Sequence, residues 1–130
     1  MSERYRRGVE IAGKLSPGGL DQFLTSRVAE VAPDFARMAI EFPFGDLYAR
    51  DGLDLRAREI VAIAALTSLG HVEQLRIHVA AALQLGASRH EIVEILMQSA
   101  VYGGFPKALN ALAQCHDLLT DNDCVEPTCG

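Results

Sequence analysis

The chain has 130 residues, of which 49% are hydrophobic and 22% charged, a composition typical of one globular domain. Seventeen acidic and twelve basic residues give a net charge of −5, which argues against binding to nucleic acids. The longest uncharged stretch, residues 60–72, is shorter than the roughly 18 apolar residues that a membrane-spanning helix needs. The basic N-terminal residues precede no apolar segment, so we expect no signal peptide and a cytoplasmic location.

The three cysteines, Cys115, Cys124 and Cys129, form no C-x-x-C pair. In a reducing compartment we expect them to be free thiols. Residues 121–130 have the polar, Pro- and Gly-containing composition of a flexible terminus. The sequence therefore predicts a single domain over residues 1–120 and a flexible tail over residues 121–130.

The first half of the chain shows helical patterns separated by proline and glycine. We expect a first helix over residues 3–14, a second over 20–31 and a third from Pro33 to about residue 42. The sequence of residues 42–45 predicts the end of that third helix. Residues 45–54 then predict an ordered loop that carries two candidate site residues, Tyr48 and Arg50.

The second half gives stronger helical signals. Asp54 can cap a helix over residues 55–69 that Gly70 ends, and residues 60–66 are apolar on every side of it. Such a helix is buried in a core or in an oligomer interface, so we expect a homo-oligomer. Further helices are expected over residues 71–85, from a Ser88–Glu91 capping box to residue 103, and from Pro106 on. No alternating segment competes with them, and the predicted fold class is all-α.

The residues that can carry chemistry gather between positions 56 and 78. His71, Gln74 and His78 share one face of their helix, and Glu59 lies on the preceding helix. We expect no metal site, because glutamine is a poor zinc ligand. The alternative interpretation of His71 and His78 is a structural histidine, and that of Glu59 is a first-turn acid favoured by the helix dipole. Arg58 and Arg76 can instead form surface or interface ion pairs. The sequence contains neither a Gly-rich phosphate loop nor a nucleophile elbow.

Several motifs in this window resemble a known family. They are REIVAIAAL at 58–66, LG at 69–70, EQLRIHV at 73–79, GAS with EIVEIL at 86–96, and VYGGFP at 101–106. Their order and spacing are similar to the core of the carboxymuconolactone decarboxylase family. Residues 41–53 resemble the segment that precedes this core in the decarboxylases, and the resemblance covers residues 4–119. It implies an all-helical, alkylhydroperoxidase D-like bundle and a homohexamer built as a trimer of dimers.

The family has two well-known branches. The alkylhydroperoxidase D-like branch reduces peroxides with a C-x-x-C pair, an upstream glutamate and a downstream histidine. Glu59 and His78 match the last two positions, but His71 and Gln74 stand at the cysteine positions. Since disulfide exchange needs two thiols, a peroxide reductase is the disfavoured alternative. The decarboxylases differ from this sequence at four of the corresponding positions, namely Phe44, Glu59, His71 and Gln74.

The resemblance therefore implies a cofactor-independent decarboxylase of a carboxylated lactone. The expected reaction is γ-carboxymuconolactone to β-ketoadipate enol-lactone in aromatic catabolism, or its counterpart on a related lactone or β-keto acid. A non-catalytic oligomeric relative is the other alternative. We expect His78 to act as general acid/base, and His71 as a second proton donor or a substrate ligand. Glu59 is expected to orient His78 or to adjust its pKa. The expected substrate-binding residues are Arg76 or Arg58 as the anion clamp, with Gln74, Tyr48 and Arg50.

Overall fold

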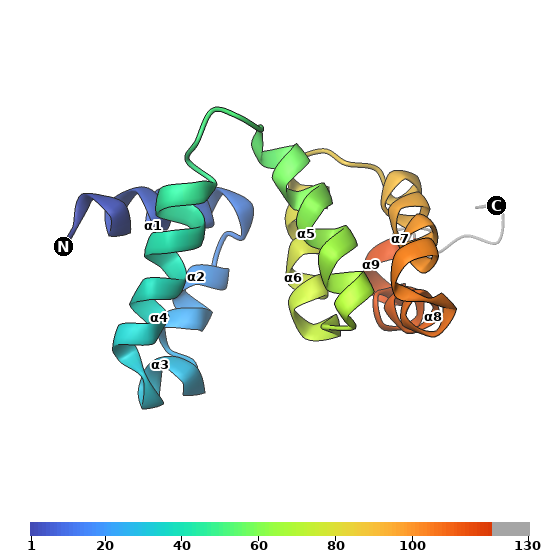
Figure 1. Ribbon diagram of the computed structural model, residues 1–130. Helices are drawn as coiled ribbons and strands as arrows, with labels where there is room; N and C mark the ends of the chain where they lie inside the picture. The colour runs from blue at the N-terminus through green and yellow to red at the C-terminus, as the bar shows by residue number, and fades with distance from the viewer. Residues whose placement is uncertain (121–130) are drawn as a thin grey trace, which may run out of the picture. The chain divides into compact units, whose positions relative to one another are not determined.

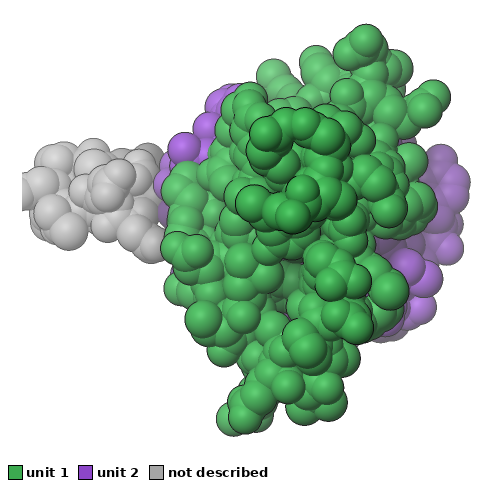
Figure 2. All heavy atoms as spheres, turned by 90° about the vertical axis from the view of Figure 1, so that its left-hand side faces the viewer, with its two compact units in different colours: residues 1–58 green, residues 59–130 purple. Residues whose placement is uncertain are grey.

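The computed structural model describes residues 1–120, and the chain divides into two compact units, Met1–Arg58 and the residues from Glu59 on (Figures 1 and 2). The described residues form helices and no strand, which confirms the all-α prediction. None of their helices is long and apolar enough to cross a membrane. The predicted tail, with Cys124 and Cys129, lies outside the described residues.

The first unit contains five helical segments. They are α1 (Glu3–Leu15), α2 (Gly19–Leu24), α3 (Arg27–Val31), α4 (Pro33–Ile40) and a π-helical segment, η1 (Glu41–Leu47). The prediction of one helix over residues 20–31 was wrong, because the chain breaks at Thr25 and Ser26. The Ser26 hydroxyl accepts a hydrogen bond from the Ala29 N–H at 3.4 Å and so caps a new helix.

The predicted helix end at residues 42–45 was also wrong. The helix continues through Pro43 with a wider turn, in which the Tyr48 N–H donates to the Pro43 carbonyl five residues back, at 2.8 Å. Gly45 serves close packing here. A Cβ at this position would collide with the Arg4 carbonyl oxygen, so glycine lets η1 lie directly against α1. The predicted loop therefore shrinks to residues 48–54.

The second unit contains the remaining helices, α5 (Leu55–Leu69), α6 (Val72–Gln84), α7 (Arg89–Gly103), α8 (Phe105–Gln114) and α9 (His116–Leu119), of which α5 begins in the first unit. Asp54 caps α5 through a 2.8 Å hydrogen bond from the Ala57 N–H, as predicted. The capping box of Ser88 and Glu91 is confirmed at the start of α7. The expected last helix divides at Cys115 into α8 and α9.

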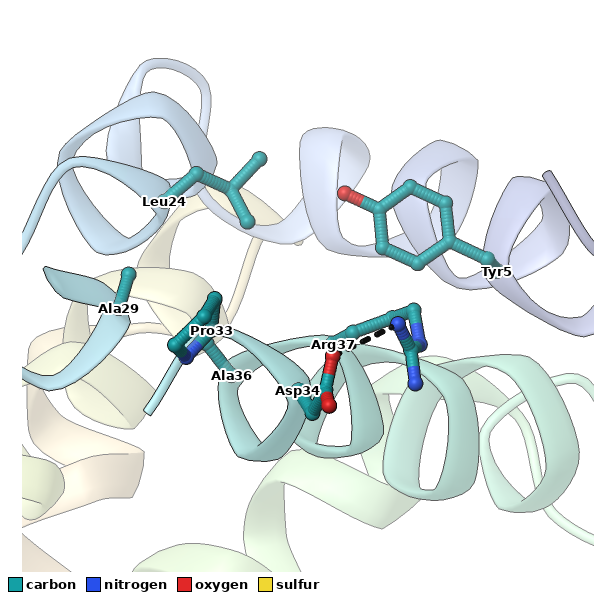
Figure 3. Close-up of a pocket in the computed structure, with 7 residues that line it drawn as sticks. All are labelled: Tyr5, Leu24, Ala29, Pro33, Asp34, Ala36 and Arg37. Atoms are coloured by element: carbon teal, nitrogen blue, oxygen red, sulfur yellow. Dashed lines mark hydrogen bonds and ion pairs between the residues drawn. The ribbon is translucent and has the colours of Figure 1, made fainter. Parts of the chain in front are cut away.

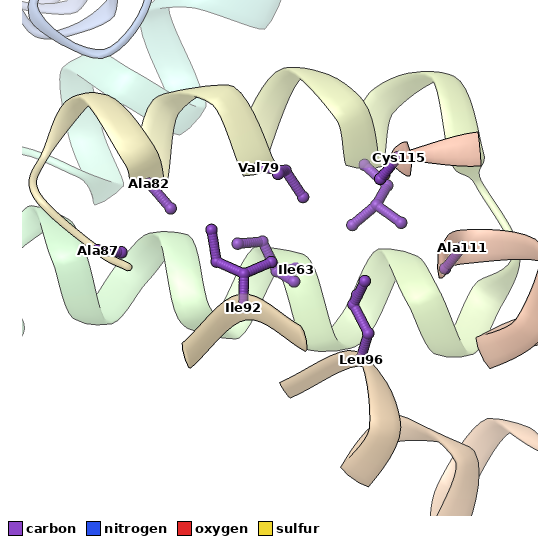
Figure 4. Packing of buried hydrophobic residues seen from close by; sticks show 9 residues of the cluster. Ile63, Val79, Ala82, Ala87, Ile92, Leu96, Ala111 and Cys115 are labelled. Atoms are coloured by element: carbon purple, nitrogen blue, oxygen red, sulfur yellow. The ribbon is translucent and has the colours of Figure 1, made fainter. Parts of the chain in front are cut away.

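The core of the second unit joins the helices α5 to α8 (Figure 4). Its fully buried members include Ile63 of α5, Leu75 and Val79 of α6, and Ile92 and Leu96 of α7. α5 is less uniformly buried than its apolar sequence predicts, because Val61 is 58% exposed. Its buried positions are Glu59, Ile63 and Thr67, which follow each other at intervals of one helical turn. The inward face of this apolar helix thus begins with a carboxylate.

Candidate active site

The centre of the candidate site is a hydrogen-bonded pair, Glu59 and His78. His78 Nδ1 lies 2.7 Å from Glu59 Oε2, so α5 and α6 bring together two residues that are 19 positions apart. An ionised carboxylate can only accept hydrogen bonds, and we therefore assign a proton to Nδ1. That assignment leaves Nε2 as the nitrogen that can exchange a proton with another molecule.

The two partners differ in exposure. The Glu59 side chain is fully buried, whereas the His78 side chain keeps 22% of its surface exposed. On α6, His78 stands next to the buried residues Leu75 and Val79, at the edge of the helix face that packs on the core. The histidine is thus the member of the pair that a small molecule can reach, with the glutamate behind it.

The second oxygen of Glu59 has no hydrogen-bond partner among residues 1–120. Oε1 is buried and takes part in no hydrogen bond within the described part of the chain. Leaving a buried polar atom unsatisfied costs about 1–3 kcal/mol, more when the group is charged. Within the described residues Glu59 therefore offers one acceptor oxygen more than the fold itself uses.

His71 and Gln74 lie near this pair in sequence, but both side chains are exposed. His71 occupies the residue before α6, in the tight turn that follows Gly70, and its backbone N–H donates to the Leu66 carbonyl at 3.0 Å. Within residues 1–120, no hydrogen bond joins either side chain to Glu59 or His78. Their expected roles stay predictions.

Arg76, one of the two arginines expected to clamp an anion, has a partner within the protein. Its guanidinium donates to both carboxylate oxygens of Asp117, at 2.6 and 2.9 Å, and to the Gln114 carbonyl at 2.5 Å. These bonds tie α6 to the end of α8 and to α9. The sequence contained no signal for this pair, because its members are 41 residues apart and lie outside any shared local motif.

The Arg76–Asp117 pair makes the stability of the second unit depend on pH. The Arg76 guanidinium, chiefly through its hydrogen bonds, lowers the pKa of Asp117 to about 2, from a usual 3.8. The folded state therefore gains stability from the ionised carboxylate above a pH of about 4, and loses this gain as the pH falls from about 4 to about 2. We expect Asp117→Asn to lower the melting temperature at pH 6 but to match the wild type near pH 2.

Thermal unfolding followed by circular dichroism across this pH range measures the difference. The carboxylate is exposed, so added salt should weaken the effect. A difference between Asp117→Asn and wild type that stays constant from pH 6 to pH 2 would show that the ion pair contributes nothing.

The other expected anion clamp, Arg58, lies against residues of the first unit. Its Nη2 donates to the Arg50 carbonyl at 3.1 Å, and its Cζ lies 6.0 Å from the centre of the Tyr48 ring. Phe44 in turn packs edge-on against Tyr48, with ring centres 5.1 Å apart. Arg50 thus contributes its backbone to this cluster, while its side chain is exposed.

The first unit also has an open depression of about 270 Å³ (Figure 3). Apolar residues of α2, α3 and α4 line it together with Tyr5, and Arg37 forms part of its wall while paired with Asp34 at 3.1 Å. None of the predicted site residues belongs to this depression.

Cys115 is the one cysteine within the described residues, and it lies in the core of the second unit. Burial raises the pKa of its thiol, which disfavours the reactive thiolate form. This cysteine therefore lacks the exposure and acidity that thiol-based peroxide reduction requires.

Comparison with known proteins decides the family. Residues 33–117 match the model of the carboxymuconolactone decarboxylase family, a span that holds both Glu59 and His78. The chain belongs to this family. Over 119 residues it is 25% identical to 4-carboxymuconolactone decarboxylase from Acinetobacter baylyi, covering 92% of this chain and 89% of that protein. It is also 31% identical to an uncharacterized 15.0 kDa protein from Paracoccus denitrificans, over 95% of this chain and 92% of that protein.

Proposed function

We propose that this member of the carboxymuconolactone decarboxylase family is a cofactor-independent decarboxylase that acts on a carboxylated lactone. The favoured substrate is γ-carboxymuconolactone, which would give β-ketoadipate enol-lactone in the cytoplasmic breakdown of aromatic compounds. A related lactone or a β-keto acid is the alternative substrate. The observation that carries the proposal is the likeness of nearly the whole chain to 4-carboxymuconolactone decarboxylase. The 2.7 Å pair of a buried carboxylate and a partly exposed imidazole supplies the group that can transfer a proton.

The reaction requires one proton at carbon. When the bond to the carboxylate breaks, CO2 leaves, and the electron pair stays on the substrate as an enolate delocalised into the lactone. The lactone is thus the electron sink, and the protein must stabilise the developing charge and deliver a proton. In its doubly protonated form His78 can give the Nε2 proton to the carbon. After this transfer His78 is a neutral imidazole whose Nδ1–H still donates to Glu59.

Glu59 fits this sequence of events as a positioning residue. Its carboxylate fixes the ring orientation of His78 and balances the charge of the imidazolium that precedes proton transfer. After transfer, the exposed edge of His78 can take a new proton from water. Glu59 has no exposed surface, so it acts on the substrate through His78 and not directly.

Release of CO2 from a panel of carboxylated lactones and β-keto acids tests the proposal. We expect catalysed release from at least one carboxylated lactone in buffer that contains no added cofactor. Dithiol-dependent turnover of a peroxide, with no decarboxylation, would favour the peroxide reductase instead. The burial of Cys115 argues against that outcome.

We further propose that the active form is a homo-oligomer, with the hexamer of the family resemblance as the expected size. Exposed apolar residues spaced three and four apart run along α4 into η1, namely Phe35, Met38 and Phe42, and Val28 and Val31 of the separate helix α3 are exposed as well. Such a stripe is unusual on the surface of a monomeric protein. Multi-angle light scattering at micromolar concentration should find an assembly, and Phe35→Glu with Met38→Glu should weaken it. A stable wild-type monomer would contradict this proposal.

A further inference from the structure

The two half-buried arginines of the described residues differ in whether a carboxylate pairs with them. Most arginines of the described residues are exposed, and the two half-buried ones are Arg58 and Arg76. Arg76 has the carboxylate of Asp117 as its partner. Among residues 1–120, no carboxylate lies within ion-pair distance of Arg58, whose partners are a backbone carbonyl and an aromatic ring. Arg58 is therefore a half-buried cation without a counter-anion in the part of the chain that the structure describes.

The hydrogen-bonding capacity of Arg58 is also incompletely used. Its Nε is buried and has no hydrogen-bond partner among the described residues. A guanidinium carries five N–H donors in a plane, and Nε–H with one Nη–H forms an edge that matches the two oxygens of a carboxylate. A buried donor and a buried charge are both costly unless they are paired. One carboxylate bound to this edge would satisfy both.

The surroundings of Arg58 hold its guanidinium in a defined position. The Arg50 carbonyl accepts from Nη2 at 3.1 Å, and the Tyr48 ring lies beside Cζ at 6.0 Å. Phe44 supports the Tyr48 ring from the side. A guanidinium held on a ring and a carbonyl loses less side-chain entropy on binding an anion than a free arginine does.

We propose that Arg58 binds a carboxylate group of a small-molecule ligand through Nε and Nη, with Tyr48 as the residue that positions its guanidinium. Identifying this ligand with the lactone substrate rests on the function proposed above; the anion site itself does not. Since Nε is shielded from solvent in the structure, binding must be accompanied by a local shift of the groups that cover it.

Binding of a stable substrate mimic tests this proposal. The probe is 5-oxotetrahydrofuran-2-carboxylate, a saturated lactone acid, and γ-butyrolactone is its uncharged counterpart. We expect the acid to bind, the uncharged lactone to bind at least tenfold more weakly, and the acid to shift the Arg58 Nε–H resonance in a ¹⁵N-correlated NMR spectrum. Arg58→Met should weaken binding of the acid by about 10- to 100-fold, the loss of a charged, bidentate hydrogen bond.

Several variants separate this role from others. Arg58→Lys keeps the charge but loses the planar edge and should recover only part of the affinity. Tyr48→Leu should weaken binding less than Arg58→Met does. Arg27→Met removes the same charge from an exposed arginine of α3 and should bind as wild type does.

The outcomes distinguish this proposal from the proposed function. His78→Gln should bind the probe normally while failing to turn over substrate. Binding that depends on Arg58, in a protein that decarboxylates nothing, would uphold the anion site and refute the decarboxylase. Wild-type affinity in Arg58→Met would overturn the anion site even in an active decarboxylase. Tighter binding of inorganic phosphate than of the lactone acid would overturn the assignment to a carboxylate.

Discussion

His78→Gln should lower the rate at which the protein decarboxylates its substrate by a factor on the order of 10² to 10⁴, the usual contribution of a general acid. The substitution keeps a polar side chain at the edge of α6, so the fold and the assembly should survive it. Glutamine cannot donate a proton to carbon at neutral pH, and for this reason the loss should fall on kcat. Initial rates of CO2 release, with assembly checked by light scattering, measure the effect.

Glu59→Gln is the matched control for this prediction. It keeps the shape of the side chain and an oxygen that can accept from His78 Nδ1, but removes the negative charge. Because Glu59 acts through His78, we expect a smaller loss than for His78→Gln, together with a changed pH profile of kcat. Wild-type turnover by a correctly assembled His78→Gln would show that the histidine is structural.

Gly103→Ala should destabilise the protein by about 1–3 kcal/mol, the usual cost of overpacking. A Cβ at residue 103 would lie 2.6 Å from Ser68 Cα and 2.9 Å from Ser68 Cβ, which is closer than real contacts permit. The end of α7 approaches the end of α5 directly there, so a methyl group must push the two helices apart. Urea unfolding at fixed protein concentration measures the change in the free energy of unfolding.

The matched control is Gly13→Ala in α1, where an added Cβ would meet no atom within 4 Å. In that helical position alanine should stabilise by about 0.5–1 kcal/mol, because it restricts the unfolded chain. Opposite signs for the two substitutions are expected. A stabilising Gly103→Ala would mean that α5 and α7 separate without cost.

The sequence predicted the elements whose signals are local. The caps of Asp54 and Ser88 and the glycines after each helix place the ends of α5, α6 and α7 to within a residue or two. It failed at Pro43, where helix-breaking composition was overridden by a π-helical turn that packs Gly45 against α1. A tertiary contact decided that segment, and no local pattern reports such a contact.

The candidate site, too, could be predicted from the sequence only in part. Helical periodicity places His78 and Glu59 on their helices, but whether they meet depends on the packing of α5 on α6, which the 2.7 Å hydrogen bond establishes. The two arginines were equivalent in the sequence. They differ in the structure because Asp117, 41 residues from Arg76, pairs with one of them.

Glu59 Oε1, which no group within residues 1–120 satisfies, has a consequence for how this position evolves. Replacing Glu59 alone by an apolar side chain would remove this acceptor but would also leave His78 Nδ1–H without its partner, so selection for stability alone favours replacing both residues together. A lineage that lost the activity should therefore drift to apolar side chains at residues 59 and 78 together and melt at a higher temperature. We expect the Glu59–His78 pair to be retained only where its function outweighs the stability that it costs. The presence of both residues in a sequence is then a marker of a working site.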